Sequence, residues 1–185
     1  MDRGFKPLTS VLASWGVRPN GVTLAGVLVT LMVPVEIAGE RWPAAGAWML
    51  AAGSFDVLDG VLARNGGFQT PFGAFWDSTL DRLSEAIVFG GLLLYYGQHV
   101  QPGALLLTFC VFVLAVLVSY TRARAEGLGV DCEVGILPRP GRVILLALGF
   151  FASKPTWALA AVGLLSLVTV LQRIFRVWRK AGRKS

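Results

Sequence analysis

Residues 56–81 read DVLDGVLARNGGFQTPFGAFWDSTLD, a segment that places four aspartates between two apolar stretches. Two aspartates lie near the end of the apolar stretch 43–63, and the other two precede the apolar stretch 83–96. A carboxylate at the centre of a bilayer costs ~2.5–3.5 kcal/mol on insertion scales, so such residues usually have a function and face the interior of a helix bundle. The segment therefore predicts two neighbouring membrane helices that share an acidic site at one end.

The composition indicates a membrane protein. Apolar residues make up 55% of the 185 residues and charged residues only 15%, whereas soluble domains average roughly 45–50% and about 25%. This excludes disordered, coiled-coil and soluble nucleic-acid-binding proteins, and the net charge of +6 fits an anionic membrane surface. We expect an all-α integral membrane protein with six transmembrane helices. Its apolar stretches cover residues 22–37, 43–63, 83–96, 104–120, 143–151 and 156–171.

The basic residues predict the orientation of the chain. Only Arg41 and Lys154 fall in the expected outer loops, so 15 of the 17 Lys and Arg residues lie on the other side, which is typical of cytoplasmic segments. Both termini and the active site are then cytoplasmic, in a protein of the cell (inner) membrane. We expect one membrane domain, with an amphipathic juxtamembrane surface helix over residues 1–16, a six-helix bundle over 17–172 and a basic cytoplasmic tail over 173–185.

The spacing of the aspartates favours a metal site. Asp56 and Asp59 are three residues apart, so they share one face of a helix. Asp77 and Asp81 are four apart and share a face of the next helix. Because glycines and a proline between the pairs turn the chain back, the four carboxylates converge. Hard divalent cations would neutralise them, and all-oxygen ligands suit Mg²⁺, with Mn²⁺ as a substitute. Two such ions can clamp a diphosphate.

Nearby residues suit a phosphate substrate, although another class of function remains open. Gly60 and Gly73 allow a substrate to lie close to the backbone, and Arg64 offers a positive fork for phosphate. Paired acids in membrane helices also mark ion pathways, so a divalent-cation carrier is the alternative.

Residues 56–81 resemble the signature of the CDP-alcohol phosphotransferase family, D-x2-D-G-x2-A-R-x8-G-x3-D-x3-D, and match it at every fixed position. The resemblance implies that a phosphatidyl group passes from CDP-diacylglycerol to an acceptor hydroxyl while CMP leaves, and it suggests a homodimer. It implies that the four aspartates bind two metal ions and that Asp81 accepts the acceptor's proton. Asn20 and Thr23 resemble the family's P-N-x-x-T motif, although they would also suit a helix N-cap. The resemblance assigns CDP-lipid binding to Asn20, Thr23, Asp56, Gly60, Arg64, Thr70 and Gly73.

A second segment concerns the acceptor. The sequences SYTRARAE at 119–126 and PRPGR at 138–142 carry Arg122, Arg124, Arg139 and Arg142. Arginine binds phosphate through two parallel hydrogen bonds, so a phosphorylated polyol is the expected acceptor, although cytoplasmic topology alone also places arginines here. These two segments are similar to those of phosphatidylinositol phosphate synthases, whose acceptor is inositol phosphate.

Two positions depart from that branch of the family. Arg122 stands where the branch often has Lys, and Gly141 where it often has Glu. A phosphatidylglycerophosphate synthase that uses glycerol 3-phosphate is therefore the alternative enzyme. Glu85 follows Asp81 by four residues on the same helix face, and either supports the metal ligands or forms a hydrogen bond within the bundle.

Overall fold

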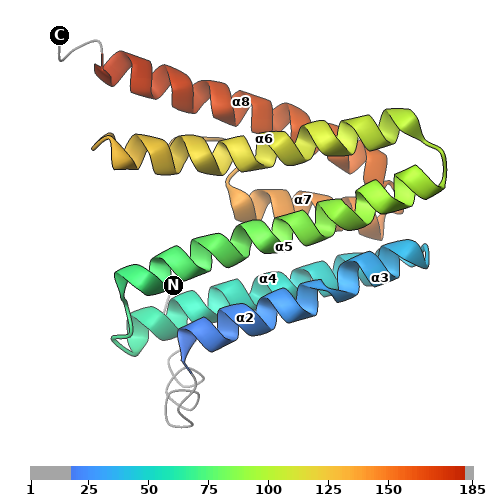
Figure 1. Cartoon of the computed structure of the whole chain (residues 1–185), viewed down its shortest axis with the longest axis horizontal. Coiled ribbons are helices and arrows are strands. Elements are labelled where there is room, and N and C mark those ends of the chain that lie inside the picture. Colours follow the sequence, from blue (N-terminus) through green and yellow to red (C-terminus); the bar gives the residue numbers. More distant parts are fainter. Residues whose placement is uncertain (1–17, 182–185) are drawn as a thin grey trace. The chain divides into compact units, whose positions relative to one another are not determined.

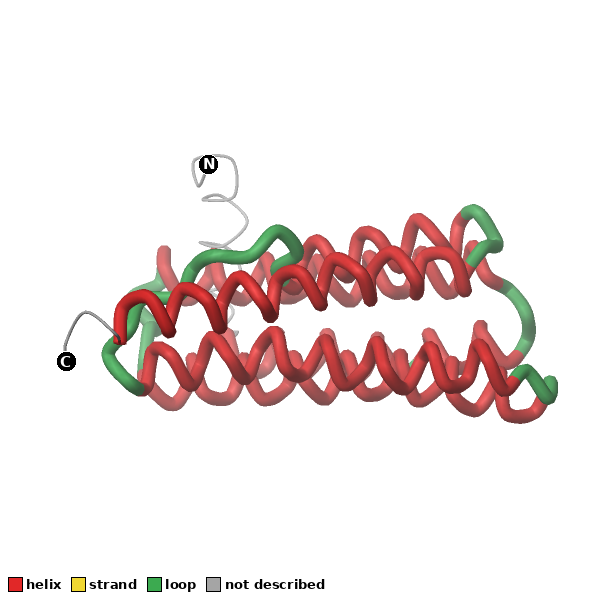
Figure 2. The backbone as a smooth tube through the Cα atoms, turned by 90° about the horizontal axis from the view of Figure 1, so that it is seen from above, coloured by secondary structure: helices red, strands yellow, loops and turns green. Residues whose placement is uncertain are grey.

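The structure, a computed structural model, describes residues 18–181, and within them it is helical with short connections. Figure 1 shows the helices in chain order, and Figure 2 shows how the loops join them. The predicted all-α class is confirmed, whereas the surface helix predicted over residues 1–16 lies outside the described residues. The helices are α2 (Pro19–Thr30), α3 (Met32–Ala38), α4 (Trp42–Asn65), α5 (Pro71–Gln98), α6 (Pro102–Gly127), α7 (Arg139–Phe151) and α8 (Pro155–Ala181).

Prolines determine where most of these helices begin. A proline occupies the first or second position of every described helix except α3. Proline suits these positions because its φ angle is already helical and its missing N–H would have no partner there. Inside a helix, proline removes a backbone hydrogen bond. Because Pro34 has no N–H to donate to the carbonyl of Thr30, the helix is interrupted at Leu31, between α2 and α3.

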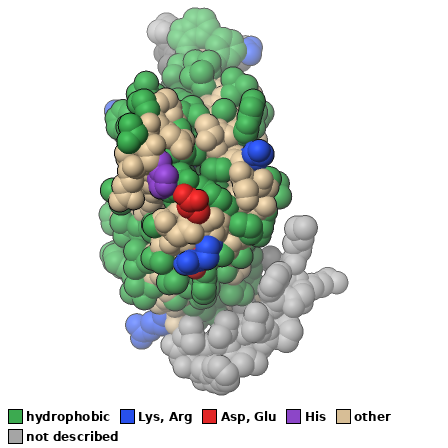
Figure 3. Space-filling view, turned by 90° about the vertical axis from the view of Figure 1, so that its right-hand side faces the viewer, with side chains coloured by type: hydrophobic (Ala, Val, Ile, Leu, Met, Phe, Trp, Pro, Cys, Tyr) green, Lys and Arg blue, Asp and Glu red, His purple; other side chains and the backbone are tan. Residues whose placement is uncertain are grey.

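Among residues 18–181, four helical segments are long and apolar enough to cross a membrane, namely Pro19–Ala38, Trp42–Asn65, Pro102–Gly127 and Pro155–Lys180. Figure 3 shows a face on which hydrophobic side chains predominate and charged ones are few. These segments support a membrane protein. The other two predicted spans differ, since α5 has 28 residues but carries the acidic pair, and the 13 residues of α7 cover only ~20 Å. Six spans therefore stay a prediction.

The described residues divide into two compact units, 18–91 and 92–181. In the first unit, α2 and α3 pack against α4. The contact is close because Gly26 has no side chain: a Cβ there would lie 3.0 Å from the Cβ of Phe55. Small residues permit such approach between membrane helices. Near the end of α3, the buried Glu36 accepts a hydrogen bond of 2.5 Å from Arg41 Nε.

In the second unit, α6 and α7 pack against α8, and the irregular segment before α7 is bonded to side chains of α8. Gln172 Oε1 accepts from the N–H of Ile136 at 3.2 Å. Thr169 Oγ1 accepts from the N–H of Leu137 at 3.1 Å and donates to the carbonyl of Leu165 at 2.8 Å. Non-helical backbone is tolerated beside apolar spans only where protein groups satisfy it, and α8 does so here.

Arg173 completes this attachment. Its side chain is only 3% exposed, and it donates through Nε to the carbonyl of Val134 at 2.9 Å and through Nη1 to the carbonyl of Val118. Residues from 173 onward, expected as a basic tail, continue α8 as far as Ala181. Arg173 thus ties α6, α8 and the segment before α7 together.

We expect Thr169→Val to lower the free energy of unfolding by about 1–3 kcal/mol, because the isosteric side chain leaves the buried N–H of Leu137 without an acceptor. Thr169→Ser keeps the hydroxyl and serves as the matched control. Unfolding of the full chain in detergent measures the difference. Equal stability of the valine variant and the wild type would show that this bond does not stabilise the fold.

Candidate active site

The turn between α4 and α5 brings the two acidic helix ends together. The N–H of Gly66 donates to the carbonyl of Leu62 at 2.9 Å, and Gly67 adopts a left-handed φ of +67°, which glycine tolerates without strain. On the far side of the turn, Thr70 Oγ1 accepts from the N–H of Gly73 at 2.9 Å and caps α5. The predicted reversal between the aspartate pairs is therefore present.

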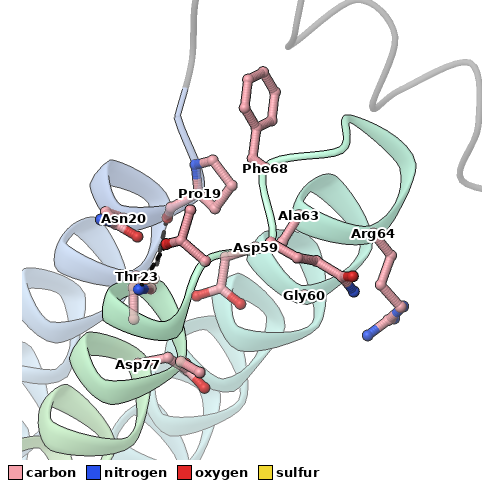
Figure 4. A pocket seen from close by; sticks show the side chains of 13 residues that line it. Pro19, Asn20, Thr23, Asp59, Gly60, Ala63, Arg64, Phe68 and Asp77 are labelled. Carbon is pink, nitrogen blue, oxygen red and sulfur yellow. Dashed lines mark hydrogen bonds between the residues drawn. The ribbon is translucent and has the colours of Figure 1, made fainter.

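A pocket of about 290 Å³ lies at this end of the first unit. Figure 4 shows it with side chains from α2, α4 and α5 around it. The first turns of α2 and α5 both contribute to its lining, and helix N-termini attract anions through their free N–H groups and dipoles. Eight residues singled out from the sequence line it: Asn20, Thr23, Asp59, Gly60, Arg64, Thr70, Gly73 and Asp77.

Asp59 is the most deeply placed acid of the pocket. Its side chain is only 5% exposed, and Oδ2 has no hydrogen-bond partner among the described residues. An unpartnered buried carboxylate oxygen is costly, so it favours a ligand that carries positive charge. Asp77 lines the same pocket, and both acids offer only oxygen, which suits a hard divalent cation. The residues present therefore fit a metal of that kind.

Two of the four predicted aspartates, Asp59 and Asp77, line this pocket. Asp56 and Asp81 are half-buried and are not among the residues that line the pocket. Within residues 18–181, no three His, Cys, Asp or Glu side chains are grouped so that they could hold a metal ion by themselves. Joint metal binding by the four aspartates stays a prediction.

Arg82 is a neighbour of the site that the sequence analysis missed. Its Nη2 lies 3.2 Å from Asp81 Oδ2, and its Nε lies 3.7 Å from Oε2 of the buried Glu85. Glu85 therefore has a cationic neighbour within its own helix, which favours the structural reading of that residue. The sequence could have indicated this neighbour, because Arg82 directly follows Asp81 and precedes Glu85 by three residues on the same helix.

Two glycines make room for the polar side chains of the pocket. A Cβ on Gly73 would lie 3.1 Å from Thr70 Oγ1 and 3.5 Å from Asn20 Oδ1. A Cβ on Gly60 would lie 3.3 Å from Arg64 Nη1. The contacts of 3.1 and 3.3 Å are tighter than ordinary packing, so a side chain at either position would displace Thr70 or Arg64 by a few tenths of an ångström.

The alternative role of Asn20 and Thr23 as helix caps is wrong. Helix α2 begins at Pro19, and its N-cap residue is Arg18, so both side chains lie within the helix. Thr23 is buried and donates to the carbonyl of Pro19 at 3.0 Å. The two residues instead form one wall of the pocket.

The four arginines predicted to bind the acceptor belong to the second unit and have different surroundings. Arg122 Nε donates to Glu126 Oε1 at 2.7 Å. Arg142 is buried, and its Nη1 lies 3.5 Å from the carbonyl of Leu137. Arg124 is exposed and Arg139 half-buried. Their shared role stays a prediction.

Comparison with known proteins identifies the family. The sequence model of the CDP-alcohol phosphatidyltransferases matches residues 17–178. The chain belongs to this family. The predicted family and enzyme class are thereby confirmed, and the alternative of a divalent-cation carrier loses its support.

Relatives of this phosphatidyltransferase carry related names. The archaetidylinositol phosphate synthase of Methanothermobacter thermautotrophicus is 37% identical over 165 residues, which cover 86% of this chain and 82% of that protein. The phosphatidylinositol phosphate synthase of Mycobacterium marinum is 33% identical over 196 residues, which cover 97% of this chain and 82% of that protein.

Solved structures agree with these relatives. A crystal structure of Mycobacterium tuberculosis phosphatidylinositol phosphate synthase with CDP-DAG bound matches with a TM-score of 0.85 and 28% identity, over 93% of this chain and 92% of that one. A second crystal structure of that enzyme, in complex with manganese and citrate, matches with a TM-score of 0.85 and 29% identity, over 93% and 88% of the chains. A relative of the same fold thus binds a divalent cation.

We expect Asp59→Asn to weaken Mn²⁺ binding by about tenfold or more, because it neutralises the buried carboxylate of the pocket. The matched control is Asp131→Asn, which removes an exposed acid from the second unit. Electron paramagnetic resonance of free Mn²⁺, titrated with the purified full chain, measures the affinity without turnover. Wild-type affinity in the Asp59 variant would exclude it as a ligand.

Proposed function

We propose that this chain transfers a phosphatidyl group from CDP-diacylglycerol to a hydroxyl of inositol phosphate and releases CMP. The observation that carries the proposal is the pocket, which is lined by six of the eight fixed residues of the family signature, including the buried Asp59. The names of the relatives support the acceptor, since proteins that match most of this chain are synthases of inositol phosphate lipids.

The pocket is suited to the CDP end of the donor. Its lining combines the N-terminal turns of two helices with the amide of Asn20 and the guanidinium of Arg64, all of which favour an anionic diphosphate. Thr70 and Gly73 form the edge at the start of α5. The carboxylates of Asp59 and Asp77 would repel the diphosphate by themselves, so binding of the donor requires a cation between them.

Two Mg²⁺ ions would supply this positive charge, and Mn²⁺ would substitute for them. Their ligands would be Asp56, Asp59, Asp77 and Asp81. A divalent cation bound there supplies positive charge to the diphosphate and stabilises the departing phosphate. Asp81 takes the proton of the acceptor hydroxyl while that oxygen bonds to the phosphorus of the phosphatidyl group. The bond from this phosphorus to the bridging oxygen of CMP breaks, and CMP leaves with the electron pair. Arg82 Nη2 lies 3.2 Å from Asp81 Oδ2, and this contact orients the carboxylate.

The acceptor's phosphate is assigned to Arg122, Arg124, Arg139 and Arg142. The contact of Arg122 with Glu126 orients its guanidinium, and Arg142 is buried with its Nη1 3.5 Å from the carbonyl of Leu137. Orientation before binding reduces the entropy lost when phosphate is bound. Glycerol 3-phosphate carries the same phosphate group, so a phosphatidylglycerophosphate synthase is the alternative that an acceptor screen distinguishes.

We further propose that the chain has six membrane spans and forms a homodimer in the cell membrane. One span consists of α2 together with α3, and the other five are α4, α5, α6, α7 and α8. The 28 residues of α5 extend ~42 Å, enough to cross the hydrocarbon with its acidic end in the interface. The shorter α7 is supplemented by the bonded segment before it. With six spans, the loops that hold Arg41 and Lys154 fall on the outer side and the other basic segments on the inner side, which favours cytoplasmic termini and a cytoplasmic site.

The acceptor is tested by CMP release from CDP-diacylglycerol and Mg²⁺ with inositol phosphate, glycerol 3-phosphate or serine in parallel. We expect kcat/KM to be highest with inositol phosphate and about tenfold or more lower with serine, which lacks the phosphate that arginines bind. A preference for glycerol 3-phosphate would establish the alternative synthase. No CMP with any of the three acceptors would contradict the proposed function.

Asp81→Asn is expected to lower kcat by about 10²-fold or more, because loss of a positioned base typically costs that much. Binding of CDP-diacylglycerol should change much less, since the pocket lining is intact. Single-turnover CMP release and equilibrium binding of the donor separate the two effects, with Asp131→Asn again as the control. A variant with normal turnover would rule out Asp81 as the base.

A further inference from the structure

A second hollow lies in the second unit, where the last turns of α8 pass the segment before α7. Its volume is about 610 Å³. One wall is the backbone and side chains of residues 134–136, and the other is a face of α8 from Gln172 to Lys180. We call it the α8 groove. None of the residues assigned to the donor or to the acceptor lines it.

The α8 groove is strongly basic. Arg176, Arg179 and Lys180 line it, and no acidic side chain is among its lining residues. Arg176 precedes Arg179 by three residues and Lys180 by four, so the three cations project from neighbouring positions on one side of the helix. Lys180 Nζ also lies 3.5 Å from the carbonyl of Asp131, which places it beside the opposite segment. Three cations around one hollow are suited to an anionic group such as phosphate.

The wall opposite α8 is held in place before any ligand binds. The carbonyl of Val134 accepts from Arg173, and the N–H of Ile136 donates to Gln172. Between them, Gly135 has a φ of +141°, and any side chain there would collide with the methyl group of Thr169. A groove with a fixed wall loses little entropy when it binds a ligand.

The surroundings favour a lipid over a soluble anion. Phe175 and Trp178 are 53% and 68% exposed, and their rings lie 5.6 Å apart. The exposed Leu171 and Ile174 precede these two residues by four positions each, so the four side chains form an apolar strip along α8. The candidate span in α8 ends at Lys180. Aromatic side chains beside cations at the end of a span are typical of the level of lipid head groups.

We propose that the α8 groove binds an anionic phospholipid that is not a substrate. Its phosphate contacts Arg176, Arg179 and Lys180, and its acyl chains lie along the exposed strip formed by Leu171 and Ile174. The guanidinium of Arg179, 5.5 Å from the centre of the Phe175 ring, is placed where the polar and apolar parts of such a lipid meet.

The test is native mass spectrometry of the purified full chain in detergent, titrated with phosphatidylglycerol or with phosphatidylcholine. Each basic residue near an anionic lipid contributes roughly fivefold in affinity. We therefore expect the double variant Arg176→Gln/Arg179→Gln to bind phosphatidylglycerol about 25-fold more weakly, with no change for phosphatidylcholine. The matched control, Arg183→Gln/Lys184→Gln, removes the same charge outside the described residues and should retain affinity within about twofold.

A second variant tests the opposite wall. Ile136→Glu places a negative charge in the groove while keeping every cation, and we expect it to weaken phosphatidylglycerol binding by about tenfold. Equal losses in the groove and control double variants would overturn the proposal in favour of general charge attraction. Equally tight binding of glycerophosphoglycerol, the same head group without acyl chains, would overturn it in favour of a soluble anion. Neither outcome depends on CMP release, so failure here is distinct from failure of the proposed reaction.

Discussion

Polar groups beside hydrocarbon must be satisfied by protein or by ligand, because lipid offers them no hydrogen bonds. In this chain, the constraint distinguishes polar groups that stabilise the fold from those that bind a ligand. Around residues 134–137, side chains of α8 meet the exposed backbone groups, and the result is a fixed segment. At Asp59, a buried carboxylate oxygen has no hydrogen-bond partner among the described residues. The first arrangement stabilises the fold, and the second identifies where a charged ligand belongs.

Local rules predicted the acidic end of the first unit. Side-chain periodicity placed each aspartate pair on one helix face, and the glycines and proline between the pairs predicted the reversal. Proline at position 19 also carried a signal that was not used: a proline that opens a helix makes Arg18 the cap and places Asn20 inside the helix. Local sequence could not show that Asp56 and Asp81 stay outside the pocket lining, because that depends on how α4 and α5 pack.

The basic residues were harder to interpret because cytoplasmic topology places arginines with several roles in the same segments. Arg173 and Arg176 are three residues apart on one helix, yet Arg173 is buried against backbone carbonyls and Arg176 lines the α8 groove. Charge counting assigned both to a tail. Only the carbonyls of Val118 and Val134, distant in sequence, decide that Arg173 is structural.

The length of α7 follows from the same constraint. Thirteen residues are too few to cross the hydrocarbon, and the segment before them is irregular. Its backbone groups are bonded to Thr169, Gln172 and Arg173 of α8. A longer helix would have satisfied its own backbone and left these side chains without a role. The irregular segment instead exposes Ile136 and residues 134–135 as one wall of the groove and leads directly to Arg139 at the start of α7. Attachment to α8 thereby fixes one wall of the groove, and Pro140 at the second position of α7 marks where that helix, with its two arginines, begins.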